Sequence, residues 1–149
     1  MQTLEVMADL ARKAANDVNF KRRLAETLLR WREWTAGVDD LTELDTFIRG
    51  HFHYRPEREE VVRTPHFMIT ELQETGKFEG DCDDVSTMLA AIARSFGYPV
   101  RYVAIRSKET FEHVFVEIYD SGSGKWRIFD PTVDKGTDYK IVEKVVVSV

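Results

Sequence analysis

Cysteine is almost absent from this chain: Cys82 is the only one among 149 residues. A single cysteine cannot form an internal disulfide bond, which is typical of a protein from a reducing compartment. The sequence also lacks an apolar run of the roughly 20 residues that span a bilayer, and its first residues lack the apolar core of a signal peptide. We therefore expect a soluble, cytoplasmic protein with no membrane partner.

Positive charge is not in excess either, since the formal net charge is −5 and the isoelectric point is near 5.4. Proteins that bind nucleic acid or an anionic membrane generally need a basic face, so the sequence argues against both partners. The basic run at residues 21–23 is interpreted as the solvated face of a helix. With 43% hydrophobic residues, the chain is long enough for one well-packed domain over residues 1–149.

The first part of the chain has the apolar spacing of helices. Two apolar stripes within residues 3–34 predict two helices with a break near residues 16–19. Asp40 is predicted to open a third helix through a capping box. Thr64 as N-cap and Pro65 at the first helical position predict a fourth helix, which Gly76 closes.

Cys82 stands at the start of the clearest helical pattern. Apolar residues recur three or four positions apart over residues 85–96, and Gly97 followed by Pro99 is a stop signal, so the helix should begin at about residues 81–83. A thiol in the first turn faces unpaired N–H groups and the positive end of the helix dipole, which favour the thiolate. Cys82 is therefore a candidate nucleophile.

Two observations favour a less reactive cysteine. A lone cysteine in an intracellular protein usually behaves as a small buried apolar residue. Asp81, Asp83 and Asp84 are negatively charged and would raise the thiol pKa unless they point away or pair with cations. Asp81 is also a suitable N-cap for the helix.

After Pro99 the pattern changes to the alternation of strands, and short loops between consecutive strands predict an antiparallel sheet. Helices first and sheet afterwards is an α+β arrangement. The predicted strands cover residues 100–106, 112–119, 125–130 and 140–149, with a turn at residues 120–124.

The hairpin of the second and third strands brings a histidine near an aspartate. If Tyr119 lies opposite Gly124, then His113 lies opposite Asp130 on the same face, with Cβ atoms about 4.5–5.5 Å apart. If the helix that starts at Cys82 adjoins the sheet there, the three residues can act as nucleophile, base and orienting group. A thiol paired with a histidine can have its pKa lowered to ~3.5–7.5. The alternative is a half-buried strand histidine and an ordinary Asp-Pro turn.

Six motifs, in this order, resemble the bacterial and phage transglutaminase-like proteins over about residues 41–132. They are YRPE at 54–57, VRTP at 62–65, GDCDD at 80–84, FGYPVR at 96–101, EHVFVE at 112–117 and FDPT at 129–132. The resemblance implies a papain-like fold, in which the cysteine helix packs on an antiparallel sheet. It also implies a Cys82-His113-Asp130 triad that uses no metal or other cofactor. Residues 1–40 would be a helical extension and residues 133–149 C-terminal strands.

The resemblance further implies chemistry on the amide bonds of a peptide or protein substrate through a thioester acyl-enzyme. We expect a cysteine-nucleophile hydrolase or acyltransferase, with water favoured as the acceptor because nothing marks an amine site. The alternative is a catalytically idle module that binds a peptide or protein partner, as in a phage or cell-envelope assembly.

For the remaining site residues we expect the oxyanion to be held by the backbone N–H of Cys82 and a side chain, with Tyr54 first and Gln73 second. Trp126 and Phe78 are candidate walls of the substrate cleft, or else ordinary core or rim aromatics. A weaker alternative function is a metal site made by three histidines. These are His51, His53 and His66.

Overall fold

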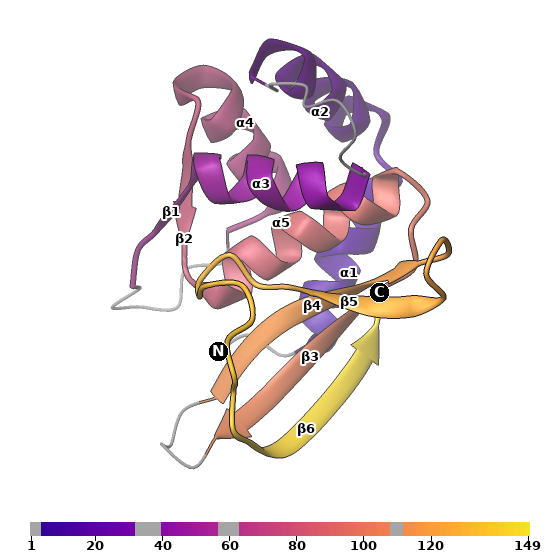
Figure 1. The fold of residues 1–149 in the computed structure, drawn as a ribbon. Coiled ribbons are helices and arrows are strands. Elements are labelled where there is room, and N and C mark those ends of the chain that lie inside the picture. The colour runs from indigo at the N-terminus through magenta and orange to yellow at the C-terminus, as the bar shows by residue number, and fades with distance from the viewer. Residues whose placement is uncertain (1–3, 32–39, 57–62, 108–111) are drawn as a thin grey trace.

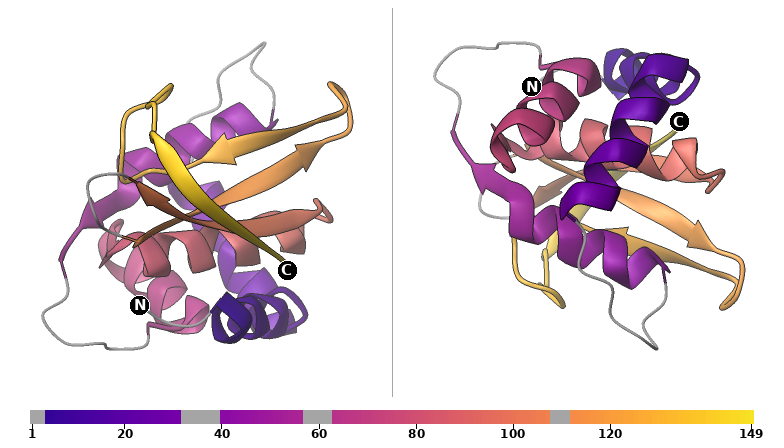
Figure 2. Two further views of the ribbon diagram at one scale, coloured as in Figure 1. Left: turned by 90° about the horizontal axis from the view of Figure 1, so that it is seen from below. Right: turned by 90° about the horizontal axis from the view of Figure 1, so that it is seen from above.

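The computed structural model describes residues 4–31, 40–56, 63–107 and 112–149, so the predicted helical residues 32–34 and parts of two motifs, at 57 and 62, lie outside it. Its helices lie over one face of an antiparallel sheet (Figures 1 and 2). The helices are α1 (Leu4–Ala15), α2 (Val18–Trp31), α3 (Asp40–His51), α4 (Pro65–Thr75) and α5 (Cys82–Ser95). The strands are β1 (Phe52–Tyr54), β2 (Phe78–Gly80), β3 (Val100–Ser107), β4 (Glu112–Asp120), β5 (Lys125–Phe129) and β6 (Ile141–Ser148). None of the described helices is both long and apolar enough to span a bilayer.

Local signals explain where α4 begins and ends. The hydroxyl of Thr64 accepts a hydrogen bond from the N–H of Phe67 at 3.1 Å, and Pro65 takes the first helical position. Gly76 ends the helix in the left-handed region, with φ of 77°, and donates its N–H to the carbonyl of Leu72. The predicted boundaries of this helix are therefore confirmed.

The main sheet has the strand order β5-β4-β3-β6, and every pair in it is antiparallel, as predicted. A second, two-stranded sheet pairs β1 with β2 in parallel. The sequence analysis missed this pair, because three-residue strands are too short to show an alternating pattern. The pair matters for the site because it sets Tyr54 beside Gly80, two residues before Cys82.

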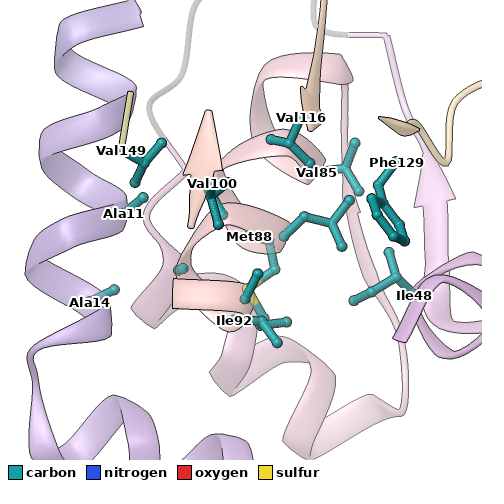
Figure 3. Packing of buried hydrophobic residues seen from close by; sticks show 14 of the residues in the cluster. Ala11, Ala14, Ile48, Val85, Met88, Ile92, Val100, Val116, Phe129 and Val149 are labelled. Atoms are coloured by element: carbon teal, nitrogen blue, oxygen red, sulfur yellow. The ribbon is translucent and has the colours of Figure 1, made fainter. Parts of the chain in front are cut away.

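The main core lies around α5, which packs on β3 and β4 while α1 lies beside it against β3 and β6. Val85, Met88 and Ile92 of α5 have no exposed surface and meet the alanines of α1 on one side and Ile48 of α3 on the other (Figure 3). Small side chains let α1 approach α5 closely. This packing fixes the N-terminus of α5, where Cys82 lies, relative to the sheet.

A second, smaller cluster lies on the opposite face of the sheet. Val103, Ile105 and Phe115 are buried there, and Tyr139 packs against them. Tyr139 belongs to the segment between β5 and β6, which crosses this face (Figure 1). Both faces of the sheet are therefore covered near His113.

The register of the β4–β5 hairpin differs from the predicted one by two residues. Tyr119 pairs with Trp126 and not with Gly124. The prediction that His113 lies directly opposite Asp130 is therefore wrong, since the pairing of Val116 with Phe129 places Asp130 beside Phe115. Because side chains alternate with period two, a shift of two residues keeps His113 and Asp130 on one face as diagonal neighbours.

Candidate active site

Asp81 is the N-cap of α5 and forms a capping box with Asp84. The carboxylate of Asp81 accepts the N–H of Asp83 at 3.0 Å and that of Asp84 at 3.3 Å, while Asp84 accepts the N–H of Asp81 at 3.0 Å. The predicted helix start is confirmed, with Cys82 as the first helical residue. The cap engages the N–H groups after Cys82 and not that of Cys82 itself.

Gly80 is required by the close approach of the capping box. A Cβ atom added at this position would lie 2.5 Å from the Cβ of Asp84, well inside van der Waals contact. Gly80 also pairs with Tyr54 across the β1–β2 ribbon. A glycine at this point therefore lets the ribbon and the first turn of α5 meet.

The thiol of Cys82 is half-buried and lies 3.8 Å from a carboxylate oxygen of Asp83. Burial raises the pKa of Cys82 to about 12. A backbone hydrogen bond from Val114 acts in the opposite direction, and the carboxylates of Asp83, Asp81 and Asp130 add to the increase. The expectation that the helix terminus and His113 lower the thiol pKa is therefore wrong for this structure, whereas the alternative, that neighbouring aspartates raise it, holds for Asp81 and Asp83. The resting thiol is neutral.

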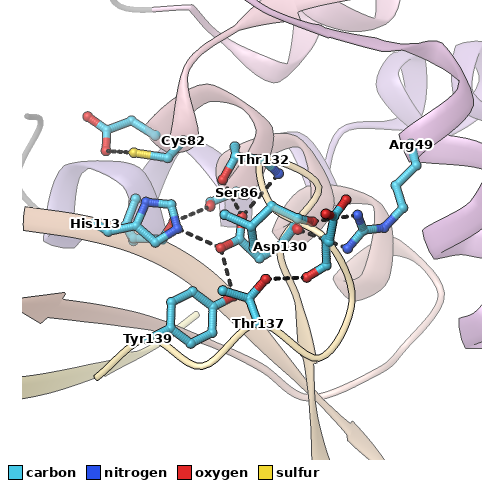
Figure 4. Close-up of polar contacts among 12 residues, drawn as sticks. Arg49, Cys82, Ser86, His113, Asp130, Thr132, Thr137 and Tyr139 are labelled. Carbon is cyan, nitrogen blue, oxygen red and sulfur yellow. Dashed lines mark hydrogen bonds and ion pairs between the residues drawn. The ribbon is translucent and has the colours of Figure 1, made fainter. Parts of the chain in front are cut away.

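His113 is hydrogen-bonded to Asp130 on the side of its ring away from Cys82. Nε2 of His113 lies 2.5 Å from Oδ2 of Asp130, whose side chain is almost fully buried. In Figure 4 the imidazole lies between Cys82 and Asp130. Because Nε2 is engaged by the carboxylate, Nδ1 is the nitrogen that can take a proton from the thiol.

Three further donors hold the carboxylate of Asp130. Oδ1 accepts the N–H of Thr132 at 3.1 Å and its hydroxyl at 2.6 Å, and Oδ2 accepts the hydroxyl of Tyr139 at 2.9 Å. Burial alone would raise the pKa of Asp130, but the hydrogen bond and charge of His113, with the donors on Thr132 and Tyr139, lower it below 3.8. Asp130 is therefore ionised at neutral pH and can stabilise an imidazolium.

Arg49 of α3 holds the segment that carries Asp130. Its guanidinium donates to the carbonyl of Asp130 at 2.9 Å and to that of Val133 at 2.6 Å (Figure 4). Both carboxylate oxygens of Asp45 accept its Nε at 3.1 Å. The aspartate thus depends on a helix about eighty residues away in the sequence.

Of the two side chains expected to hold the oxyanion, Tyr54 is near the thiol. Tyr54 pairs with Gly80, two residues before Cys82, and its side chain is half exposed. Partial burial raises the pKa of Tyr54, and a thiolate at Cys82 and the carboxylate of Asp81 would raise it further. Gln73 instead donates its amide to Glu26 of α2 at 2.9 Å. The structure gives Gln73 a role in packing α4 on α2, so we retain Tyr54 alone as a candidate.

Of the two aromatic residues proposed as cleft walls, Trp126 lines a cavity that Asp130 and Tyr139 also line, and Phe78 does not. Phe78 has no exposed surface and is a core residue, so it does not line a cleft. Trp126 packs against Tyr119 at 5.4 Å between ring centroids, and the guanidinium of Arg101 lies 4.1 Å from the centroid of its ring. Three residues separate Trp126 from Asp130, a rise of about 13 Å along a strand, and the alternation of side chains places both on the same face of the sheet.

With this geometry in view, the comparisons with known proteins identify the family. The model of the transglutaminase-like superfamily matches residues 22–131, which is most of the chain. The chain belongs to the transglutaminase-like superfamily. No curated protein matches its sequence.

A solved structure shares the fold of this transglutaminase-like chain. A candidate cysteine protease from Cytophaga hutchinsonii superposes with a TM-score of 0.54 at 19% identity, covering 80% of this chain and 41% of the other. LapG from Legionella pneumophila has a TM-score of 0.48 at 15% identity, covering 88% and 74%. The chain thus spans about two fifths of the length of the first protein. The predicted α+β, papain-like fold is confirmed.

Thr132, Tyr139 and Arg49 are site residues of this transglutaminase-like domain that the sequence analysis missed. Thr132 could have been identified from the sequence, since it ends the motif that contains Asp130. Tyr139 and Arg49 carried no local signal. Their contacts arise from the path of the chain between β5 and β6 and from the packing of α3.

The three histidines proposed as a metal site have different partners. Nδ1 of His51 lies 2.6 Å from the carbonyl oxygen of Gly76, and Nε2 of His66 lies 3.1 Å from a carboxylate oxygen of Asp17. His53 is exposed on β1. Within the described parts of this superfamily member, no cluster of three His, Cys, Asp or Glu residues could hold a metal ion, so the three-histidine site is not supported.

Proposed function

We propose that this chain is a cysteine-dependent hydrolase or acyltransferase that acts on amide or peptide bonds, with water as the favoured acceptor. The observation that carries the proposal is the 2.5 Å contact between His113 and the buried Asp130, which leaves Nδ1 for the thiol of Cys82. Membership of the transglutaminase-like superfamily and the fold shared with a candidate cysteine protease support it. The substrate class is a peptide or protein amide.

In the proposed reaction, Nδ1 of His113 accepts the thiol proton as the sulfur attacks the amide carbonyl. The backbone N–H of Cys82 and the hydroxyl of Tyr54 stabilise the oxyanion. The imidazolium gives its proton to the leaving amine, and a thioester remains on Cys82. Water then attacks the thioester, His113 accepts the water proton, and that proton returns to the departing sulfur as the acid is released.

The neutral resting thiol determines how this reaction starts. A thiol with a pKa of about 12 supplies almost no thiolate at neutral pH, so proton transfer to His113 must accompany the attack. Asp130 supports that transfer because it is ionised and fixed beside the imidazole. The proposed enzyme therefore works by general-base catalysis and does not store a preformed ion pair.

One observation favours the second candidate, a catalytically idle module that binds a peptide or protein partner. The same burial and neighbouring carboxylates that keep Cys82 neutral would keep it unreactive if His113 could not take the proton. The two candidates differ in whether an acyl group ever reaches the sulfur.

Acyl-enzyme trapping separates them. The protein is mixed with p-nitrophenyl acetate, and intact mass spectrometry follows acetylation of Cys82 and its loss over time. We expect turnover in the native protein, none in Cys82→Ser, and strongly slowed acetylation in His113→Ala. His53→Ala, which changes an exposed histidine on β1, is the matched control and should behave as native.

A native protein that is never acetylated, or whose acetyl group never leaves, would favour the binding module. Adding a primary amine identifies the acceptor. An N-acetylated amine among the products indicates an acyltransferase, and free acetate alone indicates a hydrolase.

A further inference from the structure

Tyr139 binds the same carboxylate oxygen as His113. Its hydroxyl donates to Oδ2 of Asp130 at 2.9 Å, and Nε2 of His113 lies 2.5 Å from that atom. The other oxygen, Oδ1, is held by Thr132. With donors on both oxygens, the carboxylate of Asp130 is fixed in rotation as well as in position.

The ring of Tyr139 also supports the imidazole directly. The two rings are stacked, with centroids 5.9 Å apart and planes 24° from parallel. Phe115 stacks on Tyr139 at 4.9 Å and 20°, and Phe115 is 2% exposed. The ring of Tyr139 therefore contacts both the imidazole and the small core on this face of the sheet, and Phe115 of that core also lies 6.3 Å from the imidazole. The stacked ring restricts the motion of His113 on one side (Figure 4).

The chain around Tyr139 is shaped to hold it there. Lys140 adopts φ of 49°, in the left-handed region that non-glycine residues use rarely, and its N–H donates to the side chain of Asp138 at 3.1 Å. Ile141, directly after this bend, pairs with Ser107 of β3 as β6 begins. The sheet therefore anchors the backbone two residues after Tyr139.

We propose that Tyr139 is a positioning residue for the Cys82-His113-Asp130 group: its ring fixes the plane of the imidazole, and its hydroxyl fixes the carboxylate that orients the imidazole. This inference rests on the proposed function. An imidazole held by one hydrogen bond can still turn about its side-chain torsions. The stacked phenol limits that turning and keeps Nδ1 directed toward the sulfur.

The ring is tested by the rate at which iodoacetamide alkylates Cys82 at pH 7. We expect Tyr139→Ala to lower this rate about 10-fold, because small misplacements of a reacting group have large effects on rate. Tyr139→Phe keeps the ring and should stay within about 3-fold of native on the same grounds. Tyr119→Ala is the matched control, since Tyr119 is a half-buried tyrosine of the same sheet that packs on Trp126.

The same substitution in a His113→Ala background shows whether Tyr139 acts through the imidazole. We expect no further loss there, because nothing remains to be positioned. An equal loss in both backgrounds would indicate a merely structural role and overturn the inference. If Tyr139→Ala is alkylated at the native rate while His113→Ala is alkylated slowly, the inference is overturned and the proposed function stands. A native rate in His113→Ala would instead count against the proposed function.

The hydroxyl is tested by a carbon NMR titration of the Asp130 carboxyl group in native protein and in Tyr139→Phe. Loss of one donor should raise the pKa of Asp130 relative to native, with the shift absent in Tyr119→Phe. This measurement needs neither thiol reactivity nor the more disruptive Tyr139→Ala, so it decides the case if that variant does not fold. An unchanged pKa of Asp130 would overturn the assigned role of the hydroxyl.

Discussion

Replacing His113 by alanine should leave Cys82 as a slow thiol with no base to accept its proton. Burial, together with the neighbouring carboxylates, raises its pKa to about 12. At pH 7 such a thiol is ionised in about 1 molecule in 100,000, whereas an ordinary thiol of pKa ≈ 8.5 is about 3% ionised. On thiolate population alone, the variant would react roughly 3,000-fold more slowly than an ordinary thiol.

Part of this difference is offset because a more basic thiolate is a better nucleophile. A Brønsted coefficient of 0.4–0.5 over about 3.5 pKa units returns a factor of roughly 40. The net expectation for His113→Ala is a thiol about 100-fold slower at pH 7 than the same cysteine in the unfolded chain. In the native protein His113 accepts the proton during attack, so we expect a rate at least about 10-fold above that of the variant.

The assay is alkylation of Cys82 by iodoacetamide, followed by mass spectrometry, in folded protein and in protein unfolded by urea. In folded His113→Ala the rate should rise about tenfold per pH unit from pH 7 to pH 10 without a plateau, because a thiol of pKa about 12 is far from saturation. A variant as fast as native protein would refute the role of His113 as base. A folded variant as fast as the unfolded one would refute the effect of burial.

Three further predictions concern the groups around the site. Arg49→Met should lower the free energy of unfolding by about 2 kcal/mol, because its hydrogen bonds to a buried carboxylate and two carbonyls are lost; an unchanged urea midpoint would contradict this. Gly80→Ala should lower it by about 2 kcal/mol through contact with Asp84. Gly97→Ala, at φ of 87° with open space around it, should lower it by about 1 kcal/mol, so equal effects at the two glycines would count against the contact. Because the pKa of Asp130 is lowered by folding, its contribution to stability is complete above about pH 5 and is lost as the pH falls through the lowered value. Asp130→Asn should therefore lose less stability than native protein between pH 5 and pH 2 in urea titrations.

Signals within a few residues were enough to predict several elements. The N-cap at Thr64, the stop at Gly76 and the start of α5 at Asp81 each depend on hydrogen bonds between near neighbours in the sequence. The face shared by His113 and Asp130 follows from alternation along each strand, provided that the register of the hairpin is correct to within an even number of residues. That inference survived a wrong register because the error was an even number of residues.

The tertiary structure decided the chemical state of these groups. The pKa of Cys82 depends on how deeply α5 packs against the sheet and on how many carboxylates then surround the sulfur, and neither quantity is visible in a local pattern. Phenylalanine is found both in substrate clefts and in cores, so the residue type of Phe78 does not show which it is. In the structure Phe78 lies in the core, because the β1–β2 ribbon turns it inward.

The sequence by itself therefore determined the fold class, the family resemblance and the residue types of the candidate site, because each of them follows from short-range residue spacing and from the order of the motifs. Only the tertiary structure added Arg49 and Tyr139, which reach Asp130 from α3 and from the segment before β6. Contacts of this kind depend on which distant segments of the chain pack together, and the spacing of residues along the sequence does not predict that packing.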